Sequence, residues 1–154
     1  MSANLLRDPF YGQIVASIAV TTALANREAQ KEGQQFTTSQ VRSVYHRVAQ
    51  TLEGKPPKAK EPTSAKERRQ NALYDELLAM RETIIVTNKE TGEKGPLSVP
   101  MYLKAMRAAK ESAKPRKGET GDSSYLDYAE ATLQRVEAEP DPEDEETDEA
   151  KENA

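Results

Sequence analysis

The stretch FTTSQVRSVYHRV, residues 36–48, has the pattern of a helix that begins at a defined residue. Thr37 and Gln40 stand three residues apart, as in a capping box, where two side chains bind each other's backbone amides. Phe36 before the cap and Val41 after it are spaced for a hydrophobic contact across the helix start. Apolar residues then recur at three- and four-residue steps, which predicts an amphipathic helix. Its apolar face comprises Val41, Val44, Tyr45, Val48 and Leu52.

Four further segments show helical spacing of their apolar residues. They predict helices over about residues 11–32, 64–86, 98–113 and 124–138. The helix that begins after Thr37 is expected to end near Gly54. The helix over 64–86 carries the widest apolar band, so we expect it at the centre of the core. The last helix is expected to bury one face in the core. The side chains on that face are Tyr125, Tyr128, Ala129, Thr132, Leu133 and Val136.

The connections between these helices are polar and rich in helix-breaking residues. Residues 55–63, KPPKAKEPT, hold three prolines and three lysines, and residues 87–96, TNKETGEKGP, hold two glycines and a proline. Both are predicted to be loops. Ser64 and Glu67 then predict a second capping box. The β-branched run IIV at 84–86 continues a helical pattern, so no strand is predicted. The expected fold is all-α, a compact bundle of about five helices.

Charge divides the chain into two predicted regions. Residues 137–154 carry ten Asp or Glu and one Lys, a net charge of −9, whereas residues 1–136 carry 21 Lys or Arg and 16 Asp or Glu, a net charge of +5. The acidic segment has too little apolar surface to offset the entropy of ordering it. We therefore expect a helical domain over 1–136 and a disordered tail over 137–154. A basic domain is compatible with a polyanionic partner.

Composition disfavours several classes of function. The chain of 154 residues has no cysteine and one histidine, His46, so it offers no thiolate ligand or thiol nucleophile and little for a metal to bind. It has neither an apolar run long enough to span a bilayer nor the pattern of a secretory signal, so a cytoplasmic protein without a membrane partner is expected. Phosphate-binding, dinucleotide, hydrolase and metalloprotease motifs are also missing. We predict no enzyme activity, no cofactor and no metal site.

Basic side chains are the better candidates for a functional site. Arg42 and Arg47 flank the apolar face of the opening helix, and Arg81 lies among apolar residues, where its charge is expected to need an acidic or phosphate partner. Lys104 and Arg107 begin a stripe of cations on the fourth helix. The aromatic residues mostly fall on apolar faces, so core packing is predicted for them instead of stacking on bases.

The segment TTSQVRSVYHRV, residues 37–48, resembles the signature of the Csm small-subunit family, the small subunits of type III-A CRISPR-Cas effector complexes. Three shorter segments resemble that family in the same order along the chain. They are LLAMRETIIV at 77–86, VPMYLKAM at 99–106 and YLDYAEATL at 125–133. Together the four segments cover most of residues 14–136, and the first is the specific one.

The resemblance implies a non-catalytic helical subunit in antiviral defence. Such a subunit is expected to stack with copies of itself, to contact other effector subunits, and to hold guide RNA and target RNA mainly through phosphates. The family match carries over Arg42 and Arg81 as RNA-binding residues, and helical geometry adds Arg47, Lys104 and Arg107. Two alternatives remain open: a DNA-binding regulator in which the opening stretch is a helix-turn-helix recognition helix, and a helical adaptor with no nucleic-acid partner.

Overall fold

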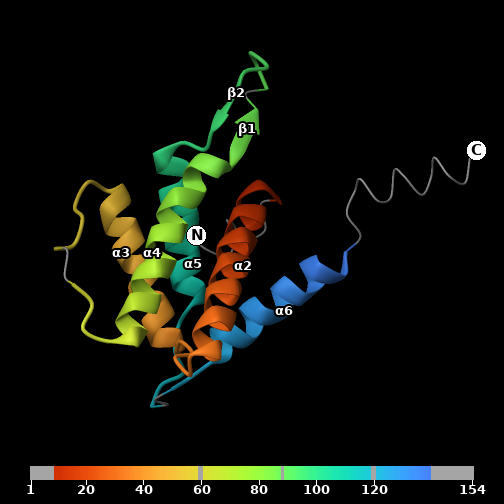
Figure 1. The fold of residues 1–154 in the computed structure, drawn as a ribbon. Helices are drawn as coiled ribbons and strands as arrows, with labels where there is room; N and C mark the ends of the chain where they lie inside the picture. The colour runs from red at the N-terminus through yellow and green to blue at the C-terminus, as the bar shows by residue number, and fades with distance from the viewer. Residues whose placement is uncertain (1–8, 59–60, 88, 119–120, 140–154) are drawn as a thin grey trace, which may run out of the picture.

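The computed structural model describes residues 9–58, 61–87, 89–118 and 121–139 (Figure 1). Those residues form five helices and one two-stranded sheet, which confirms the predicted all-α fold. None of the helices in these ranges is both long enough and apolar enough to cross a bilayer. Most of the predicted tail, residues 140–154, lies outside the described residues. In chain order the elements are α2 (Pro9–Lys31), α3 (Thr38–Leu52), α4 (Ala65–Thr83), β1 (Ile85–Thr87), β2 (Lys94–Pro96), α5 (Val99–Ser112) and α6 (Ser124–Ala138).

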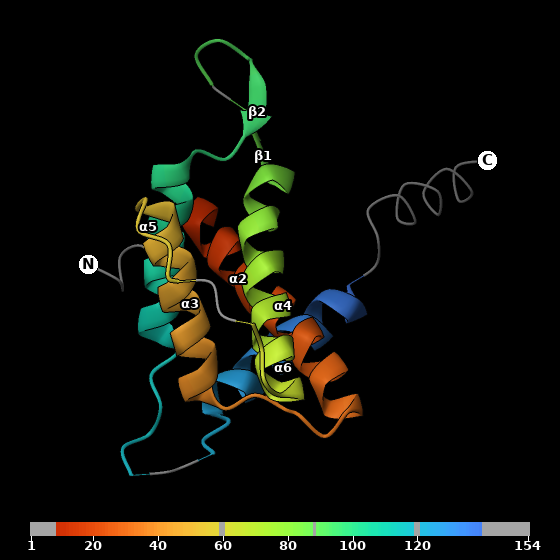
Figure 2. The same cartoon turned by 60° about the vertical axis from the view of Figure 1, so that its left-hand side comes forward.

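Helix α2, not α4, has the central position. α2 packs against α4, α5 and α6, while α3 packs against α4 and α5 (Figures 1 and 2). Neighbours can approach α2 on several sides because much of its buried surface is alanine, including Ala19 and Ala23. The expectation of a central helix over 64–86 is wrong. Within α4 only Leu73 and Leu77 are fully buried, and charged residues near both ends and in the middle of the helix keep much of it at the surface.

The start of α3 confirms the predicted cap. Gln40 N donates to Thr37 Oγ1 at 3.3 Å, and Thr37 N donates to Gln40 Oε1 at 2.9 Å. Phe36 and Val41 are both buried, as expected for residues on the two sides of a helix start. The same stretch of sequence therefore sets both where α3 begins and which face it buries.

The second predicted capping box forms only in part. Glu67 N donates to Ser64 Oγ at 3.1 Å, but the Glu67 carboxylate accepts from Thr63 N at 2.8 Å instead of from the amide of Ser64. Thr63 also donates its hydroxyl to the same carboxylate, so two donors compete against one. Residues 55–58 and 61–63 form neither helix nor strand, as predicted for that loop.

The segment between α4 and α5 differs from the prediction at both ends of the expected loop. α4 ends at Thr83, and β1 pairs antiparallel with β2, with Ile85 opposite Pro96. The expected helix through residue 86 and the expected absence of strands are therefore wrong. The predicted loop over 87–96 is confirmed only at 89–93, because Thr87 and Lys94–Pro96 belong to the strands. The hairpin projects from the bundle (Figures 1 and 2). β-branched residues favour extended backbone. In addition, Leu97 is fully buried and its amide donates to Ile84 O at 2.9 Å, which closes the hairpin at its base.

Helix α6 buries a narrower face than its apolar spacing predicts. Tyr128 and Val136 were expected to point inward, but they are 46% and 51% exposed. The reason is that α6 packs mainly against α2, so only one stripe of its surface is covered. The side chains in that stripe are Tyr125, Leu126, Ala129, Thr132 and Leu133.

The predicted boundary between the domain and the tail at residues 136 and 137 falls inside α6. Arg27 of α2 donates to the carboxylates of Glu130 and Glu137, with two contacts to Glu137 at 2.8 Å. The bonds from Arg27 hold the pKa of both carboxyls below the usual range. The first residues of the acidic segment therefore belong to the folded domain, because an ion-pair network attaches them to α2.

Candidate nucleic-acid interface

Helices α3 and α5 form an antiparallel pair at the surface (Figure 2). α3 contributes the apolar face that its cap positions, and α5 begins at Ser98, whose hydroxyl accepts from Met101 N. α5 buries small residues, including Ala105 and Ala109, in the core that it forms with α2 and α3, and small residues let helix axes approach closely. Close approach brings the polar edges of both helices together along the outside.

Cations outnumber carboxylates along this outer edge. Lys110 Nζ lies 3.0 Å from His46 Nδ1, Arg107 pairs with Glu53, and Lys114 pairs with Glu111 at 3.1 Å. The two glutamates have lowered pKa values, caused chiefly by their hydrogen bonds to Arg107 and Lys114. Four basic residues face two acidic ones, a surplus of two positive charges without counting the histidine. We call this set the α3–α5 seam: Arg42, His46, Glu53, Arg107, Lys110, Glu111 and Lys114.

Arg42 is the predicted site residue that packing explains least. Its Nε atom is buried and has no hydrogen-bond partner in the part of the chain that the structure describes. A buried donor without an acceptor is costly, and for a charged group the cost is larger. Its charge acts on Glu111, where it helps to lower the pKa of that carboxyl. Arg42 is therefore held at the seam with hydrogen-bonding capacity that the described residues leave unused.

Arg47 lies on another side of α3, toward α4. Its guanidinium carbon is 4.6 Å from the centroid of the Tyr74 ring, and Nη1 donates to Asn71 Oδ1 at 3.1 Å. Tyr74 in turn bonds Thr51 of α3 at 2.6 Å. These contacts give Arg47 a packing role between two helices.

Arg81 also has partners within the fold: the acidic partner that was expected, Glu82, and a backbone carbonyl that was not. Nη1 donates to the backbone oxygen of Leu97 at 2.8 Å, and Nη2 lies 3.8 Å from Glu82. Because Leu97 is buried at the base of the hairpin, Arg81 connects the end of α4 to the start of α5. The main partner is a backbone carbonyl that sequence spacing does not reveal.

The two predicted residues on α5 lie in different surroundings. Lys104 Nζ is 5.3 Å from the ring centroid of Tyr11, toward the start of α2, whereas Arg107 lies on the seam. The structure thus brings Arg42 and Arg107 to one surface and places Arg47, Arg81 and Lys104 outside it.

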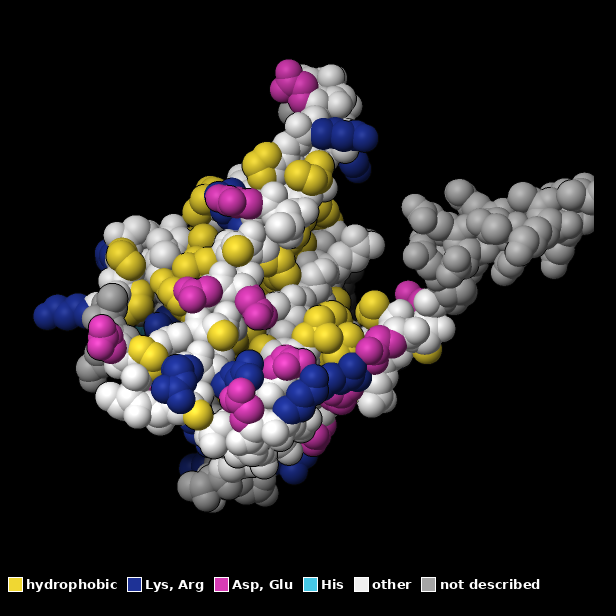
Figure 3. All heavy atoms as spheres, viewed as in Figure 1, with side chains coloured by type: hydrophobic (Ala, Val, Ile, Leu, Met, Phe, Trp, Pro, Cys, Tyr) yellow, Lys and Arg dark blue, Asp and Glu magenta, His cyan; other side chains and the backbone are white. Residues whose placement is uncertain are grey.

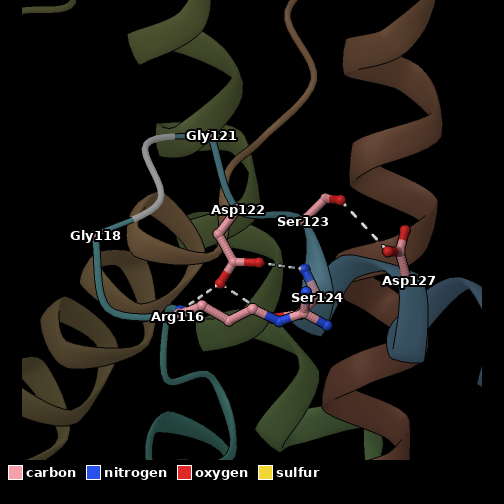
Figure 4. Close-up of a pocket in the computed structure, with 7 residues that line it drawn as sticks. All are labelled: Arg116, Gly118, Gly121, Asp122, Ser123, Ser124 and Asp127. Atoms are coloured by element: carbon pink, nitrogen blue, oxygen red, sulfur yellow. Dashed lines mark hydrogen bonds between the residues drawn. The ribbon is translucent and has the colours of Figure 1, made fainter.

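Asp122 is a structural residue of this region that the sequence reasoning missed. Its carboxylate accepts from Arg116 N at 2.6 Å, from Ser124 N at 2.9 Å and from Ser124 Oγ at 3.1 Å (Figure 4). The amide of Arg116 is the main cause of the lowered pKa of Asp122, followed by that of Ser124. Thr38 N also donates to Asp122 O at 2.7 Å, so the α5–α6 loop is attached to the start of α3. An aspartate two residues before a serine amide is an Asx-turn signal that could have identified it.

The face formed by α4, α2 and α6 has a more balanced charge. Figure 3 shows Lys and Arg side chains intermixed with Asp and Glu over α4, α2 and α6. Several of them pair, including Arg69 with Glu32 and Lys31 with Glu28. Among the described residues no group of His, Cys, Asp or Glu is arranged to hold a metal ion. The seam is therefore the surface we select as the candidate interface.

The chain matches no protein-family model, no curated protein and no solved structure. The likeness to CRISPR small subunits stays a prediction from the segments quoted above. What the chain does is inferred below from its own contacts and charges.

Proposed function

We propose that this chain is a non-catalytic subunit of a type III CRISPR ribonucleoprotein complex that holds guide and target RNA phosphates along the α3–α5 seam. The observation that carries the proposal is the surplus of two positive charges on the seam. The TTSQVR segment at residues 37–42 supports the choice of complex. The partners proposed with it are other effector subunits and copies of the chain.

The geometry of the seam suits a phosphate backbone better than base edges. Glu53, the C-cap of α3, is eleven residues after Arg42, which at the helical rise is about 17 Å along the seam. Phosphates of one strand advance about 3.4 Å each along a duplex, so the seam can follow on the order of five of them. Lys and Arg charges recognise phosphates without regard to sequence, and in a guide-directed complex base pairing supplies the specificity.

The DNA-binding alternative uses the same side of the molecule. Ser39, Ser43 and His46 are exposed along α3, and a recognition helix needs such a polar outer face. The two functions differ in their dependence on sequence. A regulator prefers one duplex DNA sequence by a large factor, whereas the proposed subunit binds RNA of any sequence with similar affinity.

The experiment measures the salt dependence of RNA binding. Single-stranded RNA is titrated with the full chain between about 50 and 200 mM salt. The logarithm of the affinity falls linearly with the logarithm of the salt concentration, with a slope of about 0.7 per neutralised phosphate. The variant Arg42→Gln, Lys110→Gln, Lys114→Gln removes three seam cations. Its slope should therefore be shallower by about two, with unchanged helicity.

A matched control removes three exposed lysines elsewhere, Lys31, Lys89 and Lys94, each replaced by glutamine. Its net charge equals that of the seam variant, so a general charge effect would change both to the same extent. Equal losses in the two variants, or no RNA binding by the natural chain at the lower salt concentration, would refute the proposal. A strong preference for one duplex DNA sequence would favour the regulator.

A further inference from the structure

An open hollow of about 580 Å³ lies where the end of α5 and the start of α6 meet α2, and its walls are mainly apolar. It is separate from the seam residues, although Ser112 in its wall is only two residues before Lys114. A volume of this size is in the range of small-ligand sites. We call it the tyrosine hollow, and its lining residues are Gly12, Val15, Ser112, Ser124, Tyr125 and Tyr128.

The two tyrosines have different roles in the wall. Tyr125 is buried and fixed, since its hydroxyl bonds that of Tyr45 at 2.9 Å. Tyr128 is 46% exposed, and its ring centroid is 5.8 Å from that of Tyr125 at an interplanar angle of 47°. Gly12 brings no side chain to the opposite wall, although glycine weakens a helix relative to alanine. The hollow therefore has an accessible aromatic ring and a glycine in its wall.

Three basic residues follow in the chain within five residues of Ser112, which lines the hollow. Lys114, Arg116 and Lys117 follow the end of α5 within the loop that Asp122 holds in place. Figure 4 shows the Arg116 side chain passing the Asp122 carboxylate toward Ser124, and Ser124 also lines the hollow. An aromatic wall with cations at its margin is complementary to a group that is flat and apolar at one end and anionic at the other.

We propose that the tyrosine hollow binds one unpaired nucleobase, stacked on Tyr128, with the attached phosphate at Lys114 and Arg116. The inference rests on the proposed function, since a strand leaving the seam at Lys114 arrives at the hollow. Stacking on tyrosine tolerates every base because each base has a π-face. The site would therefore position a strand end or a flipped nucleotide without reading its sequence.

The first test uses adenosine monophosphate as the probe, which does not depend on the seam. Its base proton signals in the NMR spectrum should broaden saturably with the natural chain, and equally with Tyr128→Phe, which keeps the ring. Tyr128→Ala should lose at least most of the broadening with unchanged helicity, and ribose 5-phosphate should not compete effectively. No broadening with the natural chain, or the same broadening with Tyr128→Ala, would overturn the inference.

The second test separates the hollow from the seam. A short single-stranded RNA should bind the natural chain about tenfold more tightly than an abasic strand of equal length, and Tyr128→Ala should abolish that difference. Equal affinities for the two strands would reject the hollow while leaving the seam proposal intact. The three-lysine control and the seam variant could lose RNA binding equally, while Tyr128→Ala loses binding of adenosine monophosphate. In that case the seam proposal fails and the nucleotide site in the hollow is retained.

A second copy of the chain is the competing occupant of an apolar hollow. Sedimentation of the natural chain and of Tyr128→Ala measures it directly. We expect the same oligomeric state for both proteins, with and without adenosine monophosphate. The natural chain could instead self-associate, with Tyr128→Ala abolishing the association and adenosine monophosphate leaving it intact. That result would assign the hollow to an interface between copies and overturn the nucleotide site.

Discussion

Replacing Tyr45 with phenylalanine tests the hydrogen-bonded hydroxyl chain in the core. Thr22 Oγ1 donates to Ile18 O at 2.8 Å, so it must accept from Tyr45 at 2.6 Å. The Tyr45 oxygen can then accept from the hydroxyl of Tyr125 at 2.9 Å. Burial raises the pKa of the Tyr45 hydroxyl well above its ordinary value, so it stays protonated and keeps this order of donors.

Tyr45→Phe removes two hydrogen bonds and leaves the Tyr125 hydroxyl without an acceptor. A net hydrogen bond contributes about 1 kcal/mol, and a buried polar group without a partner costs about 1–3 kcal/mol. Thr22 keeps its bond to Ile18, so the main unsatisfied group is the Tyr125 hydroxyl. We therefore expect Tyr45→Phe to lower the free energy of unfolding by about 2–3 kcal/mol. Tyr125→Phe removes one bond and should cost about 1 kcal/mol.

Urea unfolding of both single variants and the double variant completes a thermodynamic cycle. Because the bond between Tyr45 and Tyr125 is lost in either single variant, the double variant should be less destabilised than the sum of the two. Tyr128→Phe, at an exposed position, is the control and should change stability by less than about 0.5 kcal/mol. A loss below that value for Tyr45→Phe, or additive effects in the cycle, would refute the proposed order of donors.

Three further predictions concern the loop, the hairpin and the end of α6. The pKa of Asp122 is lowered from 3.8, so its contribution to stability is complete at neutral pH and is lost as the pH falls through the folded value. Asp122→Asn should therefore lower the urea midpoint at pH 7 and reduce the dependence of that midpoint on pH below about 4. The same pH dependence below about 4 in the natural chain and the variant would contradict this. Arg81→Met should speed hydrogen exchange at the Leu97 amide without affecting α3, and unchanged exchange would remove Arg81 as an anchor. Arg27→Met should speed exchange over residues 135–138, whereas full protection there would show that apolar packing alone holds the end of α6.

The seam and the hollow divide RNA binding into two physically different contributions. Cations of the seam act on phosphates over several residues, so their effect weakens with salt. The hollow would act by stacking, which depends much less on salt and needs a base. Measurements with abasic strands and at several salt concentrations can therefore assign each contribution to its own residues.

Local patterns predicted the helices well where the stabilising partners are close in sequence. The cap of α3 involves Thr37 and Gln40, and the start of α5 involves Ser98, so short-range spacing contains the needed information. The run at 84–86 was predicted as helix because its apolar spacing is compatible with either structure. Its strand depends on Leu97 closing the hairpin from more than ten residues away.

The candidate site was predictable as a set of cations but not as a surface. The family resemblance selected Arg42 and Arg81, and helical geometry added Arg47, Lys104 and Arg107. The fold gives Arg47 an aromatic ring and Arg81 a buried carbonyl, and these partners come from other elements of the structure. Only the packing of α3 against α5 places Arg42 near Glu111 and Arg107 beside Glu53.

By itself the sequence determined the all-α class, the cap of α3, the basic charge of the domain and the candidate arginine at Arg42. Each of these depends on composition or on residues within a few positions of one another. Tertiary structure alone decided that α2 is central, that the hairpin forms, and that Tyr128 is exposed beside a hollow. The reason is that exposure and pairing depend on which helices lie next to a side chain. Along FTTSQVRSVYHRV, residues 36–48, the spacing defined a helix. The packing of that helix against α4 and α5 determined that Arg47 contacts α4 and that Arg42 lies on the seam.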